Sequence, residues 1–171
     1  YGSLGEIYKD TVDIIMCESM SSIFEGRNAS RVAKEFSERV WLSWTNRGHQ
    51  PDQLPSTEAL SKAVDFSIEA DVECTLINCS HADMASNSIK ELKRASRFGI
   101  FANSSTFKEV DLSVATKDVD AIHHLNSEEI SAKEYAMIAL SWAKEGAFVV
   151  GGCCGTTVEH TREIKLLIDS L

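Results

Sequence analysis

The chain has 171 residues, is 43% hydrophobic and carries a formal net charge of -9. Its length allows one sizeable core but is short for two full domains, so we expect a single domain over residues 1–171. The acidic balance, without a run of lysine or arginine, argues against binding nucleic acid or an anionic membrane surface, and no apolar stretch approaches the roughly 20 residues of a membrane span.

Apolar runs of strand length alternate with segments of helical period along the chain. The predicted strands are residues 12–17, 40–45, 74–78, 99–102 and 147–151. Helices are expected at residues 2–10, about 28–37 and about 85–97, and apolar stripes of helical period within 60–68, 135–142 and 164–171 indicate three more. This alternation is typical of successive strand-helix units around a parallel sheet.

Residues 104–130 interrupt the alternation with a long stretch of mixed polarity. Loops of this length are usually functional lids or disordered connections. The alternative is a surface excursion that carries a short extra strand; the stretch has one brief apolar patch, near 119–125.

The fold class is α/β, but two architectures fit the five units. A closed eight-stranded TIM barrel takes about 250 residues, so this chain would supply about its last five units. The missing N-terminal units would then come from elsewhere in a longer chain or from a partner chain. The structural alternative is an open, doubly wound five-stranded sheet.

The most specific motif is the Gly-Gly-Cys-Cys-Gly-Thr-Thr run at 151–157, between the last strand and the last helix. Binding sites in parallel α/β folds gather at the carboxyl ends of strands, and the glycines allow Cys153 and Cys154 to turn toward one point. Thr156 and Glu159 have the spacing of a capping box, which would fix the start of the helix.

A third thiol, Cys79, also lies at the end of a predicted strand. Three cysteine ligands from two strand ends would leave the fourth position of zinc open, as catalytic sites do. Cys79 as a small buried residue, and Cys153–Cys154 as a redox pair, are the alternatives. Cys17 and Cys74 lie inside apolar strands and are predicted to be core residues. The odd number of cysteines indicates free thiols in a reducing compartment, so we expect a cytoplasmic protein.

The run at 151–160, with Asn78-Cys79 upstream, resembles the zinc-dependent homocysteine S-methyltransferase family. That family includes betaine, S-methylmethionine and cobalamin-dependent enzymes built on an eight-stranded barrel. Residues 41–45 and Asn103-Ser104 extend the resemblance, which covers nearly the whole chain and places it in the C-terminal part of the barrel.

The resemblance implies particular roles for individual residues. Cys79, Cys153 and Cys154 would bind Zn²⁺, and Glu18 would hold the amino group of homocysteine. Asn78 and Thr156 could support the thiolates through hydrogen bonds. His81 is near Cys79 in sequence, but a surface or loop role is expected for it.

The sequence therefore predicts zinc-dependent methyl transfer from a small onium-type or folate donor to homocysteine, giving methionine. S-methylmethionine is the favoured donor. Ser19 follows Glu18 where betaine-using members carry tyrosine, which argues against that subfamily. The alternatives are an incomplete barrel that binds zinc without catalysis and a thiol redox protein.

Overall fold

The computed structural model describes residues 2–9, 11–107 and 127–170. The strands are β1 (Ile15–Met20), β2 (Val40–Trp44), β3 (Cys74–His81), β4 (Phe98–Asn103), β5 (Ser105–Phe107), β6 (Ser127–Glu129) and β7 (Val149–Gly152). The helices are α1 (Gly2–Tyr8), α2 (Ile23–Ala33), α3 (Leu60–Glu69), α4 (Ala82–Asn87), α5 (Ile89–Leu92), α7 (Ala132–Lys144) and α8 (Val158–Ile168). Within these described ranges, no helix has the length and apolar character needed to cross a membrane.

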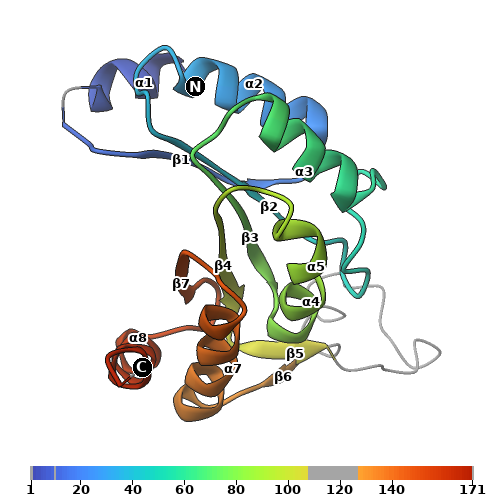
Figure 1. Ribbon diagram of the computed structural model, residues 1–171, viewed down its shortest axis with the longest axis vertical. Coiled ribbons are helices and arrows are strands. Elements are labelled where there is room, and N and C mark those ends of the chain that lie inside the picture. The colour runs from blue at the N-terminus through green and yellow to red at the C-terminus, as the bar shows by residue number, and fades with distance from the viewer. Residues whose placement is uncertain (1, 10, 108–126, 171) are drawn as a thin grey trace, which may run out of the picture.

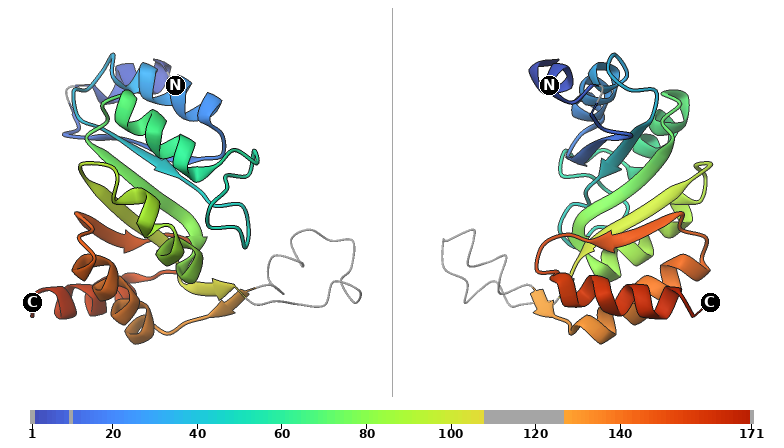
Figure 2. Two further views of the ribbon diagram at one scale, coloured as in Figure 1. Left: turned by 45° about the vertical axis from the view of Figure 1, so that its right-hand side comes forward. Right: turned by 90° about the vertical axis from the view of Figure 1, so that its left-hand side faces the viewer.

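Five strands form one parallel sheet in the order β1-β2-β3-β4-β7, which is also their order along the chain. A doubly wound sheet would reverse its strand order at a switch point and place helices on both faces. Here the order never reverses, and the helices that follow the strands lie along the outside of the curved sheet (Figures 1 and 2). The architecture is therefore part of a TIM barrel.

The core lies between the sheet and these helices. Alternation along each strand sends one set of side chains toward the helices, including the fully buried Leu42 and Trp44 of β2 and Ile100 of β4. A Cβ at Gly26 would overlap the Trp44 ring, so this glycine lets α2 approach β2 closely. Trp142 of α7 is also fully buried.

The other face of the sheet corresponds to the inside of a closed barrel. It carries Met16, Trp41 and Phe101, all half-buried. Gly151 allows the Phe101 ring to lie close to β7, because a Cβ there would be 2.8 Å from Phe101 Cδ1. This face is less completely covered than the helix-facing core.

Several predicted boundaries were wrong. Helix α2 begins five residues earlier than its predicted start, because the side chain of Ser22 accepts a hydrogen bond (3.1 Å) from the backbone N–H of Glu25 and caps it there. The predicted helix at 85–97 is two short helices, α4 and α5, separated at Ser88. The Ser88 hydroxyl donates to the carbonyl of Met84 and lies 3.2 Å from Asn46 Nδ2.

The two ends of the interruption at 104–130 form short strands that pair with each other in antiparallel fashion. Strands β5 and β6 pair there, and Figure 2 shows them projecting from the end of β4. The apolar patch near 119–125 lies outside the described residues.

Candidate metal centre

The loop after β7 is held against the end of β4 by three hydrogen bonds. The Cys153 N–H donates to the carbonyl of Ala102 (2.8 Å), and the Cys154 N–H donates to Asn103 Oδ1 (3.1 Å). The Ser104 N–H donates back to the carbonyl of Cys154 (3.0 Å). Both neighbouring cysteines are thereby fixed through their backbone, and their side chains are free to turn toward a common point.

Gly155 closes this loop in a conformation that favours glycine. Its φ is +76°, and a Cβ on it would lie 2.5 Å from Ser104 Oγ. Left-handed backbone costs an L residue about 1–2 kcal/mol even without such a contact. The glycine after the cysteine pair is therefore required both by backbone angle and by space.

The predicted capping box was displaced by one residue. The helix α8 is capped at Thr157 rather than Thr156, and the Thr157 N–H donates to Nδ1 of His160 (3.1 Å) in place of a contact with Glu159. The hydroxyl of Thr156 instead donates to the carbonyl of Cys153 (2.7 Å). Thr156 thus stabilises the cysteine loop through a bond from its side chain to the loop backbone.

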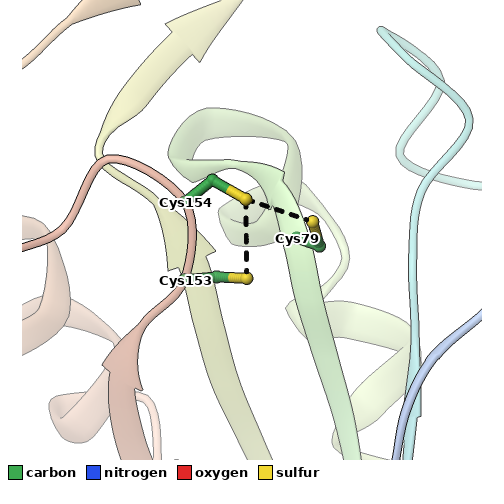
Figure 3. A group of neighbouring side chains, drawn as sticks. All are labelled: Cys79, Cys153 and Cys154. Atoms are coloured by element: carbon green, nitrogen blue, oxygen red, sulfur yellow. Dashed lines mark hydrogen bonds between the residues drawn. The ribbon is translucent and has the colours of Figure 1, made fainter.

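Cys79 reaches the same point from β3, where the strand is irregular. Its φ is +53°, and the register with β4 shifts between Asn78 and His81. A left-handed residue in a strand turns its side chain out of the regular alternation. This local distortion directs the Cys79 thiol toward the loop after β7 (Figure 3).

The three thiols form one compact cluster. The Sγ atoms of Cys79 and Cys154 are 3.6 Å apart, those of Cys153 and Cys154 are 4.0 Å apart, and all three lie within 4.8 Å of one another. Tetrahedral zinc with Zn–S bonds of about 2.3 Å requires ligand sulfurs about 3.8 Å apart. The spacing and chemistry of this donor set therefore fit zinc.

Without a metal, two of these thiols, Cys79 and Cys153, resist ionisation. Burial, followed by the contacts with Cys154 and Cys153, raises the pKa of Cys79. Burial also raises the pKa of Cys153. At neutral pH both groups are neutral thiols without a metal, so a divalent cation must displace their protons to bind.

Two other predicted site residues, Asn78 and Glu18, lie elsewhere on the sheet. Asn78 is buried, and its carboxamide bonds to Ser19 and Ser43. Glu18 is exposed on β1, two strands from β3, and alternation places its side chain opposite the buried Cys17. The carboxylate therefore faces the inner side of the sheet.

The expectation for His81 was wrong. The ring is 7% exposed, and its Nδ1 lies 2.9 Å from Ser105 Oγ at the start of the β5–β6 hairpin. Cys17 and Cys74 are buried as predicted, and burial raises their pKa to about 11 and about 12. They contribute to packing and lie outside the thiol cluster.

Sequence reasoning gave no role to several residues that build the site. The sequence connects Asn103 and Ser104 to the site only through the family resemblance, although they hold the Cys154 backbone. For Tyr135 the sequence predicts only a place in a helix. Its buried hydroxyl lies 2.7 Å from the carbonyl of Ala102 and 2.8 Å from that of Gly151, directly beneath the loop.

Comparison with known proteins identifies the family. Residues 3–168 match the family model described as homocysteine S-methyltransferase. The chain belongs to the homocysteine S-methyltransferase family. Among curated relatives, the homocysteine S-methyltransferase YbgG of Bacillus subtilis (strain 168) is 26% identical over 162 residues, which cover 93% of this chain and 48% of that protein.

Solved structures of another family member have the same fold. The apo form of the homocysteine methyltransferase MmuM from Escherichia coli superposes with a TM-score of 0.68 at 18% identity, covering 96% of this chain and 53% of that one. Its metallated form gives a TM-score of 0.67 at 20% identity and covers 94% and 47%. The chain thus spans about half the length of the relatives that it matches.

Proposed function

We propose that this chain is the zinc-binding portion of a barrel domain that transfers a methyl group to the sulfur of homocysteine, giving methionine. The observation that carries the proposal is the cluster of three thiols contributed by two strand ends. Membership of the family supports the reaction class. Thiol ligands remain reduced in the cytoplasm, which is the proposed location.

Cys79, Cys153 and Cys154 would hold the metal and leave one tetrahedral position for the acceptor. Bound zinc would supply the Lewis acidity that keeps the homocysteine sulfur as a thiolate at neutral pH. The backbone contacts from Asn103 and Ala102 keep the Cys153–Cys154 loop in place, so little reorganisation is needed when the acceptor binds.

Glu18 would pair with the ammonium group of homocysteine on the inner side of the sheet. A charged hydrogen bond of this kind orients the acceptor and distinguishes it from simple thiols. S-methylmethionine is the proposed donor. The bond between its sulfonium sulfur and methyl carbon would break, with the electron pair remaining on that sulfur. A new bond would form to the homocysteine sulfur, whose proton goes to solvent.

The test measures zinc per chain after dialysis, followed by methionine formation from homocysteine and S-methylmethionine. About one zinc is expected in the parent, and little in a Cys79→Ser variant, because removal of one thiolate leaves an incomplete donor set. Cys17→Ala is the matched control, since it removes a buried thiol outside the cluster and should retain the metal.

The outcomes separate this proposal from its alternatives. Zinc without methyl transfer from any onium or folate donor would favour a metal-binding part of a barrel that needs its remaining strand-helix units. Zinc-free parent protein with a reversible disulfide between clustered thiols would favour redox chemistry and overturn the proposal.

A further inference from the structure

Two non-glycine residues adopt left-handed backbone next to residues that the proposed function uses. Ser19, with φ +59°, directly follows Glu18, and Cys79, with φ +53°, directly follows Asn78. Each lies at an irregularity of the sheet, where the register shifts between Cys17 and Met20 in β1 and between Asn78 and His81 in β3. Backbone of this kind persists only where surrounding contacts hold it.

For Ser19, the carboxamide of Asn78 supplies such contacts, and it joins three strands. Its Oδ1 accepts from the backbone N–H of Ser19 (3.0 Å) on β1 and from the hydroxyl of Ser43 (2.6 Å) on β2. Its Nδ2 donates to Ser19 Oγ (2.8 Å). Asn78 is only 1% exposed, so these bonds are shielded from competing water.

We propose that Asn78 is a positioning residue that sets the separation between Glu18 and the thiol cluster. Its side chain holds the residue after Glu18, and its own backbone continues directly into Cys79. The ammonium and sulfur of one acceptor molecule are thereby recognised at a fixed distance. The inference rests on the proposed function. It adds that Asn78, by setting this separation, selects an amino thiol of homocysteine's length.

The test compares two acceptors that share a thiol and carbon chain but differ in the ammonium group. These are homocysteine and its deamino analogue, γ-mercaptobutyrate. Dissociation constants are measured by titration calorimetry on the zinc-loaded protein, with whatever further strand-helix units its natural chain carries. Zinc per chain is measured for each variant beside the calorimetry.

The parent should prefer homocysteine, and Asn78→Ala should weaken homocysteine binding by about tenfold or more, the effect of losing one charged hydrogen bond. The affinity for γ-mercaptobutyrate and the zinc content should stay within about twofold, because the three thiolates remain. Ser67→Ala is the matched control. Its buried hydroxyl bonds to Trp44 and Ala63 on the helix side of the sheet, and both acceptors should bind it as they bind the parent.

A coupling measurement distinguishes positioning from general support of the fold. In a Glu18→Gln background, Asn78→Ala should have little further effect on homocysteine binding, because both changes remove the same ammonium contact. Should Asn78→Ala fail to fold, Ser43→Ala removes one of the three hydrogen bonds and should weaken homocysteine selectively by about threefold.

Equal loss of both acceptors or of zinc in Asn78→Ala would overturn the inference, as would effects of Asn78→Ala and Glu18→Gln that simply multiply. These results differ from failure of the proposed function itself. In that case the zinc-loaded parent would bind neither thiol or would show no preference for homocysteine.

Discussion

Two edges of the sheet differ in how completely the described residues build them. At the β4–β7 edge, the cysteine loop is held by its N–H groups, which donate to the Ala102 carbonyl and to Asn103 Oδ1, and by the close contact of Gly155 with Ser104. At the β1 edge, Glu18 is exposed beside a groove of about 470 Å³. The helix α1 borders this groove, and its Ile7 is 65% exposed.

If the proposed function holds, this difference separates the metal site from the acceptor contact. The thiol cluster draws its ligands and their backbone supports from β3, β4 and β7. The proposed acceptor contact, Glu18, lies on β1, which among the described strands pairs only with β2. Changes near Gly155 should therefore affect the metal first, whereas changes on β1 should affect the acceptor and leave the metal in place.

The largest effect is expected from Gly155→Ala. The new Cβ would meet Ser104 Oγ at 2.5 Å with φ at +76°, so the loop must shift and the cysteine pair with it. Zinc affinity should fall by about 100-fold, the upper range for loss of a contact that orients a ligand. Competition with a chelator measures this.

Gly146→Ala is the matched control for backbone strain. Its φ is +97°, but nothing lies within 4 Å of the added Cβ. It should lose about 1–2 kcal/mol of stability without losing zinc. Equal zinc affinity in both variants would mean that the β4–β7 edge does not position the metal ligands.

On the other edge, Glu18→Gln should raise the KM for homocysteine by about tenfold, because a neutral amide replaces a charged partner of the ammonium group. Zinc per chain should not change. Glu159→Gln, an exposed change on α8, is the control. Loss of zinc in Glu18→Gln would show that the two edges are not independent.

The repeating strand-helix units of this fold could be predicted from the sequence. Strand-length apolar runs located all five parallel strands of the main sheet, and the glycine-flanked Cys153–Cys154 pair indicated a site at a strand end. Periodicity reports which face of an element is buried, so it finds elements better than their ends. The start of α2 at Ile23 depends on one hydroxyl contact from Ser22, which periodicity does not detect.

The contacts that support the site were harder to predict because they join residues far apart in the chain. Asn78 lies 59 residues from Ser19, and Asn103 lies 51 residues from Cys154. The left-handed backbone of Ser19 and Cys79 has no sequence signal, since neither is glycine. His81 was misjudged for the same reason, because its partner Ser105 comes from a hairpin that begins after β4.

The metal-free protein should lose stability in alkaline solution partly through two buried thiols outside the cluster, one on the edge strand β1 and one on the central strand β3. Burial raises the pKa of Cys17 on β1 to about 11 and that of Cys74 on β3 to about 12, from an ordinary value of 9.0. The folded state therefore favours the protonated thiols. Their contribution is complete below pH 9.0 and is lost as the pH rises through the two raised pKa values.

At pH 10 this loss amounts to about 1 kcal/mol for each thiol. Urea unfolding at pH 8 and pH 10 measures it. Cys17→Ala and Cys74→Ala should each flatten the pH dependence of the unfolding free energy. A pH dependence unchanged in both variants would contradict this origin.

The smallest effect is expected from Tyr135→Phe, which tests how strongly the β4–β7 edge depends on support from below. The hydroxyl lies within hydrogen-bond distance of the carbonyls of Ala102 and Gly151, and its removal should cost about 1 kcal/mol of unfolding free energy. Zinc affinity should change less than in Gly155→Ala, because the bonds from Asn103 and Ala102 to the cysteine loop remain. Tyr8→Phe, at a 48% exposed position on α1, is the control and should be neutral. If Tyr135→Phe lost zinc as readily as Gly155→Ala, the metal ligands would be held by the packing of α7 against the sheet rather than by the loop's own contacts with β4.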